Sequence, residues 1–182
     1  MPVLVRMRTE SDLDVCEQLC LDVHQRDGYP RRLPDDLRRF MAWPNAICAW
    51  VAELDGEVVG HVALHASGSP EIMDLTARMT GQPVERFGVV ARLLVSPHAR
   101  RNGLGRSLLL RASGHAVSLG LVPLLEVTTD LQPAIDLYED SGWLRVGKTS
   151  VHWRSTGDVV DEYAYVAPSL DGAPALSSSD TT

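Results

Sequence analysis

Hydrophobic and polar residues alternate in the first of seven short stretches, and the others are strand-like, largely apolar runs; both patterns predict β-strands. The predicted strands span 3–7, 46–54, 57–66, 87–95, 121–128, 143–153 and 159–167, and Asp55-Gly56 between the second and third is a strong hairpin signal. Helical spacing of apolar residues, with Thr9 as the first N-cap, predicts helices over 10–27, 34–43, 70–80, 103–119 and 133–141. Each helix is followed by a glycine or a proline that ends it.

This order of elements predicts an α/β (α+β) fold with a mixed sheet. Connections that contain a helix favour parallel pairing of strands, whereas the hairpins favour antiparallel pairing. Helices are expected on both faces of the sheet. The whole pattern fits one domain over residues 1–167, and the Ser-, Pro- and Ala-rich stretch 168–182 is predicted to be a disordered C-terminal tail.

The composition of the 182-residue chain narrows the possible partners and compartment. A net charge of -7 argues against a general nucleic-acid binder. The sequence contains no apolar run long enough to cross a membrane and no signal peptide. Three cysteines, an odd number, argue against a disulfide framework and favour the cytoplasm; Cys16 and Cys20 are expected to be small buried residues rather than metal ligands.

The stretch from Leu93 to Ser107 carries the clearest chemical signal. An apolar strand leads into a basic loop with Gly103 and Gly105, and a helix begins there. Free N–H groups at a helix N-terminus, together with the helix dipole, bind phosphate, and glycines let the ligand come close. The loop lacks the Gly-Lys-Ser/Thr of a Walker loop and the third glycine of a dinucleotide-binding fingerprint. A simple helix start with two glycines is the alternative.

Two motifs in the expected order resemble the GNAT superfamily of acyl-CoA-dependent N-acyltransferases. Arg100-x-x-Gly103-x-Gly105 after a strand is similar to the family's pyrophosphate motif. The second motif, an Ala-x-x-Leu-Tyr-Glu helix that ends at Gly-aromatic, is matched by residues 134–143. The resemblance covers almost all of the chain before the tail, and it implies a single-domain, mostly antiparallel sheet of about seven strands.

The resemblance also implies where acetyl-CoA, the co-substrate, would bind. The pantetheine arm would run beside the strand at Leu93, Leu94 and Val95, in a gap where two parallel strands separate. The pyrophosphate would lie on the loop and the first turn of the helix. The implied cofactor-binding residues are Leu93, Leu94, Val95, Arg100, Arg101, Asn102, Gly103, Leu104, Gly105, Arg106 and Ser107. No metal is implied.

Tyr138 and Glu126 are the predicted catalytic residues. Tyr138 matches the tyrosine that family members place near the thioester sulfur as a general acid; its alternative role is packing on the sheet. Glu126 lies on a largely apolar strand, where burial should raise its pKa toward the range of a general base. Its alternatives are a carboxylate paired with an arginine such as Arg92, or a base supplied by a histidine or a water chain.

Several neighbouring positions leave alternatives open. His61 and His65 lie on one face of a strand and are expected either to pack under a helix or to line the acceptor cleft. The family often has an asparagine where this chain has Leu131, and the adjacent Asp130 is expected to cap the following helix. The insertion 68–84 is long enough to cover the acceptor side and influence specificity.

The sequence therefore predicts an enzyme, an N-acetyltransferase in which an amine attacks acetyl-CoA directly. The sequence does not indicate whether the acceptor is a small molecule or a protein amine. The family resemblance allows a homodimer. The alternatives are a non-catalytic acyl-CoA-binding or regulatory module on the same fold and a protein-interaction domain. Six of the 17 basic residues, and no acidic residue, lie between 86 and 125, so an anionic cofactor would meet a cationic segment in an acidic body.

Overall fold

The computed structural model describes residues 3–153 and 156–168. Seven strands form one sheet: β1 (Val3–Met7), β2 (Ala46–Leu54), β3 (Glu57–His65), β4 (Phe87–Val95), β5 (Val122–Thr128), β6 (Leu144–Trp153) and β7 (Asp158–Val166). The helices are α1 (Leu13–Asp27), α2 (Leu37–Met41), α3 (Pro70–Thr80), α4 (Leu104–Ser118) and α5 (Gln132–Asp140). The predicted mixed fold is confirmed. Of the predicted tail 168–182, only Pro168 is among the described residues.

Strand order along the sheet is β1-β2-β3-β4-β5-β7-β6. Every neighbouring pair is antiparallel except β4 and β5, which are parallel. The Asp55-Gly56 hairpin forms as predicted, with Leu54 paired to Glu57 and both turn residues at positive φ. The α4 helix connects the two parallel strands, as a parallel connection requires.

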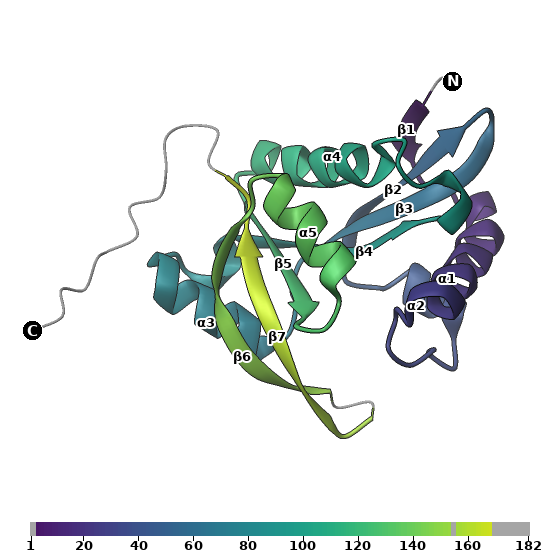
Figure 1. The fold of residues 1–182 in the computed structure, drawn as a ribbon. Helices are drawn as coiled ribbons and strands as arrows, with labels where there is room; N and C mark the ends of the chain where they lie inside the picture. Colours follow the sequence, from purple (N-terminus) through teal and green to yellow (C-terminus); the bar gives the residue numbers. More distant parts are fainter. Residues whose placement is uncertain (1–2, 154–155, 169–182) are drawn as a thin grey trace, which may run out of the picture.

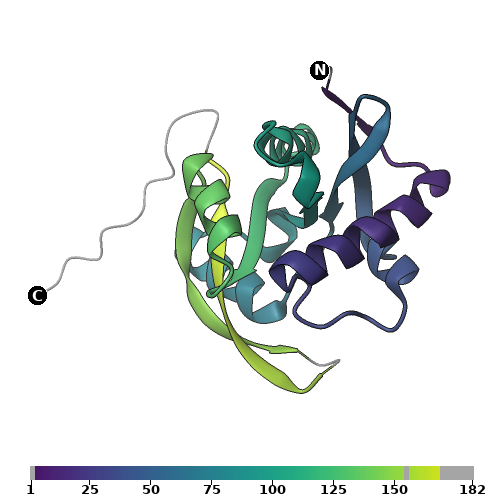
Figure 2. The same ribbon diagram turned by 45° about the vertical axis from the view of Figure 1, so that its right-hand side comes forward.

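Helices cover both faces of the sheet, and each group buries its own apolar cluster (Figures 1 and 2). α4 and α5 pack on one face, where residues such as Leu108, Ile135 and Leu125 form the largest cluster. On the other face α1 and α2 cover the strands of the N-terminal half, and α3 covers β4 to β7. Because strand side chains alternate between faces, neighbours such as Leu124 and Leu125 belong to different clusters.

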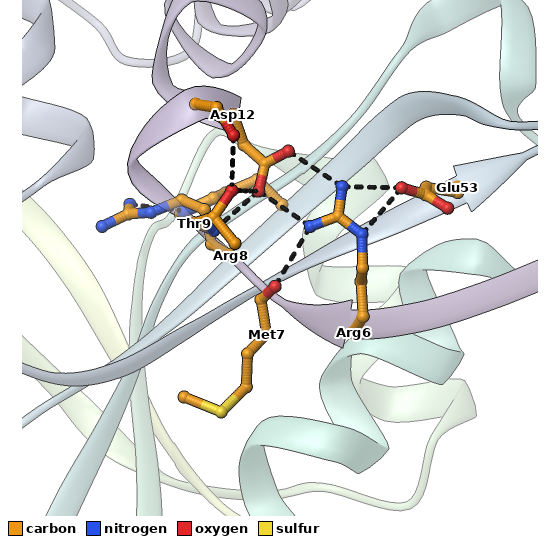
Figure 3. Close-up of polar contacts among 8 residues, drawn as sticks. Arg6, Met7, Arg8, Thr9, Asp12 and Glu53 are labelled. Carbon is orange, nitrogen blue, oxygen red and sulfur yellow. Dashed lines mark hydrogen bonds and ion pairs between the residues drawn. The ribbon is translucent and has the colours of Figure 1, made fainter.

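A charged network fastens the start of α1 to the sheet edge (Figure 3). Arg6 on β1 donates two hydrogen bonds to Asp12, both of 2.8 Å, and its Nε donates to Glu53 on β2 at 2.7 Å. Asp12 also accepts the backbone N–H of Thr9 at 2.6 Å, in the predicted capping arrangement. Arg6 holds the pKa of the Asp12 carboxyl well below its usual range.

The sheet opens in its middle, between β4 and β5. Their pairing covers Phe87 to Val89 only, while β4 continues beside β3 as far as Val95. A bulge at Arg92, which has a positive φ of 55°, interrupts the register with β3 and bends β4. The edge of β4 from Leu93 to Val95 is therefore left without a partner strand on the β5 side.

Candidate active site

The N-terminus of α4 faces the gap with unused hydrogen-bond donors. Gly103 is the N-cap, and its φ of 73° requires the left-handed region that glycine tolerates. Within the described residues, the N–H groups of Leu104, Gly105 and Arg106 donate to no acceptor. Such groups, at the positive end of the helix dipole, form an anion-binding surface.

The two loop glycines are needed for different reasons. A Cβ on Gly103 would meet no atom within 4 Å, so its requirement is the backbone conformation. A Cβ on Gly105 would lie 3.2 Å from Leu137 Cδ2 and 3.8 Å from Val95 Cγ2. Gly105 therefore lets α4, α5 and the end of β4 come close together around the gap.

A cavity of about 380 Å³ joins the strand end, the loop and α5. Most of the predicted cofactor-binding residues line it: Leu93, Val95, Arg100, Arg101, Gly103, Leu104, Gly105 and Arg106. Tyr138 lines the same cavity, together with residues that the sequence did not assign to cofactor binding: Val23, Asp27, Tyr29, Pro133 and the motif residues Ala134 and Leu137. Leu131, predicted only as a departure from the family pattern, is also a lining residue.

Three predicted cofactor-binding residues do not line the cavity, and each supports the structure around it. Leu94 packs in the cluster beneath α1, and only its backbone takes part in the strand. The Asn102 side chain donates to the carbonyl of Ala99 at 3.1 Å, and the Ser107 hydroxyl donates to the carbonyl of Gly103 at 3.1 Å. These bonds hold the loop and the first turn of α4.

The arginines of the loop differ in their partners. Arg100 forms an ion pair with Asp27, the last residue of α1, with one nitrogen–oxygen distance of 3.1 Å. It thereby ties the loop to α1. Arg101 and Arg106 line the cavity and form no ion pair within the described residues, so their charges can meet an anion there.

Tyr138 presents its hydroxyl group without a hydrogen-bond partner among the described residues. The side chain is buried on α5, and its ring packs 6.0 Å from Tyr165 and 6.4 Å from Trp143, measured between ring centroids. Burial raises the pKa of the phenol above its usual value. Tyr138 is therefore protonated at neutral pH and can donate a proton into the cavity.

Glu126 lies on the opposite face of the sheet, the face that α3 covers. Its Oε2 accepts the backbone N–H of Ser69 at 3.0 Å, at the start of the predicted insertion. Burial raises the pKa of this carboxyl, as expected from the sequence. The alternative pairing with Arg92 is not found, because Arg92 donates to the carbonyl of Phe40 at 2.7 Å and stacks on its ring.

Tyr29 connects the cavity with the carboxylate side. It follows α1, lines the cavity, and lies close enough to Glu126 for its charge to raise the tyrosine's pKa, although burial is the main cause. His24 contacts the carbonyl of the next residue, Pro30, at 2.6 Å and so anchors this turn. The sequence pattern identified Gly28-Tyr29-Pro30 only as the end of a helix.

His61 and His65 are packed in the core rather than facing the cavity. His61 Nδ1 lies 2.9 Å from the carbonyl of Arg92, and its Nε2 lies 3.1 Å from Arg8. Burial lowers the pKa of His61 to about 3 and that of His65 to about 4. Both rings are neutral at pH 7, and the packing alternative accounts for them.

Two smaller expectations are also settled. Asp130 does not cap α5, because the N-cap residue is Leu131, and Asp130 instead pairs with Arg31 at 3.0 Å.

Burial raises the pKa of the Cys16 and Cys20 thiols to about 11, so neither is a ready nucleophile. The described residues contain no group of three or more side chains arranged to hold a metal ion, and none of their helices is long and apolar enough to cross a membrane.

The sequence model of the acetyltransferase (GNAT) family matches residues 18–143, which include the strand, the loop and the α5 motif. The chain belongs to the GNAT acetyltransferase family. It is therefore an acyltransferase by family, and the predicted resemblance is confirmed. A search of curated protein sequences finds no significant match.

Solved structures of GNAT acetyltransferases share the fold. The ribosomal-protein-S18-alanine N-acetyltransferase of Escherichia coli superposes with a TM-score of 0.65 at 17% identity, covering 94% of this chain and 97% of its own. Arabidopsis thaliana NAA60 in complex with acetyl-CoA gives a TM-score of 0.67 at 23% identity, covering 91% and 97%. The yncA protein of Salmonella typhimurium with its cofactor acetyl-CoA gives a TM-score of 0.65 at 18% identity, covering 94% of this chain and 97% of its own.

Proposed function

We propose that this GNAT protein transfers the acetyl group of acetyl-CoA to the nitrogen of an amine. The observation that carries the proposal is the single cavity that joins an unpaired strand edge, a free helix N-terminus and the Tyr138 hydroxyl. These three features suit the amide-bearing arm, the pyrophosphate and the thioester of one extended ligand. Two solved relatives hold acetyl-CoA, which supports the same ligand here.

The loop and the strand would bind different parts of acetyl-CoA. The free N–H groups of Leu104, Gly105 and Arg106 and the charges of Arg101 and Arg106 suit the pyrophosphate. Backbone groups of Leu93 to Val95 have no partner strand on the β5 side and suit the amides of pantetheine, although the Val95 carbonyl already accepts from Arg100 at 3.5 Å. The apolar side chains of Leu131 and Leu137 complete the wall.

The acceptor would approach from the carboxylate side of the gap. An alkylammonium group has a pKa of about 10.4, so releasing its proton at pH 7 costs about 4.6 kcal/mol. Glu126, whose pKa is raised by burial, is the base that the site offers for this proton. The acidic excess of the chain outside the loop segment also favours a cationic acceptor.

The reaction needs no covalent enzyme intermediate. The nitrogen lone pair attacks the thioester carbonyl carbon, the carbon–sulfur bond breaks, and the thiolate takes the proton of Tyr138. Glu126 holds the first proton, which left the ammonium group before attack. The nitrogen loses its second proton as the amide forms, and that proton restores the phenol of Tyr138. The raised thiol pKa of Cys16 and Cys20 argues against a route through an acyl-cysteine.

Calorimetry and an amine panel test the proposal. Acetyl-CoA should bind with a dissociation constant in the micromolar range or tighter, and release of CoA thiol should accelerate with at least one amine of the panel. Arg106→Glu, inside the cavity, should weaken binding at least tenfold. Arg111→Glu, on the same helix but outside the cavity lining, is the matched control and should bind normally.

Each result decides between function classes. Absence of acetyl-CoA binding would reject both the enzyme and the acyl-CoA-binding module. Binding without acetylation of small-molecule or peptide amines would favour the non-catalytic module. An equal loss of binding in the two arginine variants would place the pyrophosphate away from the cavity.

A further inference from the structure

A second glutamate lies beside Glu126, and the proposed reaction gives it no role yet. In the pairing of β5 with β7, Thr128 lies opposite Glu162 and Glu126 lies opposite Ala164. Opposite residues in an antiparallel pair point to the same face, and diagonal neighbours, roughly 7–8 Å apart, remain within reach of long side chains. Glu126 and Glu162 are therefore diagonal neighbours on the face that α3 covers.

Both carboxyl groups are fixed at one oxygen. Glu162 is only 4% exposed, and its Oε1 accepts the indole N–H of Trp153 at 2.8 Å. Glu126 Oε2 accepts the N–H of Ser69 at 3.0 Å. A side-chain hydrogen bond from Ser69 also lowers the pKa of Glu126, and within residues 3–153 and 156–168 neither glutamate forms an ion pair.

The groups that face this pair do not neutralise it. From β4, the charge of Arg92 lowers the pKa of Glu126, but its guanidinium is engaged with Phe40. From the first turn of α3, Glu71 adds another negative charge near both glutamates. From the segment after α1, Tyr29 contributes a phenol whose pKa is raised, so it is neutral.

Glu162 is buried and Glu126 is half-buried, and neither has a counter-charge, so the two carboxylates do not both ionise easily and their titrations are coupled. Burial, together with the charge of Glu126, raises the pKa of Glu162 to about 7. Burial also raises the pKa of Glu126. The pair therefore takes up a proton as the pH falls through about 7, where Glu162 titrates.

We propose that Glu162 is a positioning residue for Glu126: the two carboxyl groups share one proton in the resting site, and Glu162 ionises when a cationic amine lies beside Glu126. The amine supplies the missing positive charge, and the second negative charge then strengthens Glu126 as a proton acceptor. The site consequently selects acceptors that arrive protonated. This inference rests on the proposed function, because the amine is its acceptor.

Carbon-13 NMR of protein labelled at the glutamate carboxyl carbon tests the shared proton without any turnover. In the wild-type protein the Glu126 signal should titrate in two steps, the second near pH 7, because ionisation of Glu162 is felt at Glu126. In Glu162→Gln the Glu126 signal should titrate in one step. A single step in the wild-type protein would overturn the inference.

The pH dependence of kcat/KM tests the effect on the reaction. The kcat/KM of the wild-type protein should rise with pH in two steps. The Glu162→Gln variant should lack the second step. Its kcat/KM should therefore be at least tenfold below that of wild type at pH 8 and equal to it below pH 6. Asp161→Asn, the adjacent exposed carboxylate on β7, is the matched control and should keep both steps. A uniform loss at every pH would indicate a structural role and reject the proposal.

Trp153→Phe provides a second variant in case Glu162→Gln does not fold. It removes the indole N–H that stabilises ionised Glu162, so the second step should move to higher pH in both measurements. An unmoved second step would overturn the inference. Two coupled carboxyl titrations in a protein that acetylates no amine would reject the proposed function while leaving the proton sharing intact.

Discussion

At the scale of single residues, Tyr138 is held by its ring rather than by its hydroxyl. The aromatic rings of Tyr165 and Trp143 pack around it at centroid distances of 6.0 and 6.4 Å, and these contacts do not involve the phenol oxygen. Tyr138 was predicted because it matches the tyrosine of the family motif that residues 134–143 resemble. Glu162 was not predicted, since its place beside Glu126 depends on the register of two strands.

Removing the Tyr138 hydroxyl should therefore separate catalysis from binding. Tyr138→Phe should lower kcat about 100-fold, in line with the loss of a positioned general acid. Its acetyl-CoA dissociation constant by calorimetry should stay within about twofold, because the ring contacts persist. Tyr163→Phe, on the neighbouring strand and outside the cavity lining, is the control. Unchanged kcat in Tyr138→Phe would remove this residue from its role.

At the scale of elements, hydrophobic patterns and turn residues predicted every strand and α-helix of the described structure to within a few residues. The gap between β4 and β5 was expected only from the family resemblance, because the pattern of β4 is continuous through Arg92. Its cause, a bulge at a non-glycine residue with positive φ, leaves no mark in the apolar spacing. The prediction that Asp130 caps α5 was wrong, because its carboxylate forms an ion pair with Arg31, which lies in the segment after α1.

The α4 helix offers a matched pair of glycines for a stability test. Gly103→Ala should lower the free energy of unfolding by about 1 kcal/mol, because φ is 73° there and L-residues avoid that region. Gly114→Ala should raise it by about 0.5–1 kcal/mol, because the position is helical and nothing lies within 4 Å of the added Cβ. Urea denaturation of both variants measures the shifts. Shifts of the same sign would contradict the conformational assignment of Gly103.

At the scale of the whole molecule, the two sides of the gap are joined by few strong contacts. β4 and β5 pair over three positions, and the segment after α1 reaches across through Arg31–Asp130 and Arg32–Asp158 at 3.0 and 3.2 Å. These ion pairs are exposed, and such pairs contribute at most about 1 kcal/mol each. The packing of α4 and α5 across both sides therefore carries most of the connection.

The strands on the N-terminal side of the gap contain buried histidines that must stay neutral, and this requirement links the stability of the fold to pH. Burial lowers the pKa of His65 to about 4, against about 6.5 in the unfolded chain. As the pH falls below 6.5, the unfolded state gains a proton at His65 that the folded state cannot accept until about pH 4. A buried neutral histidine of this kind therefore lowers the free energy of unfolding as the pH falls from 6.5 toward 4.

Comparison of wild type with His65→Gln isolates this effect. The variant should be less stable at pH 7, where it loses the packing of the buried ring. The difference in the free energy of unfolding should then shrink by about 1.4 kcal/mol per pH unit from pH 6.5 toward pH 4, because glutamine has no proton to gain. Urea denaturation at half-unit pH intervals measures it. Parallel stability curves would mean that His65 has the same pKa in the folded protein as in the unfolded chain, and the burial argument for the neutral histidines would then be wrong.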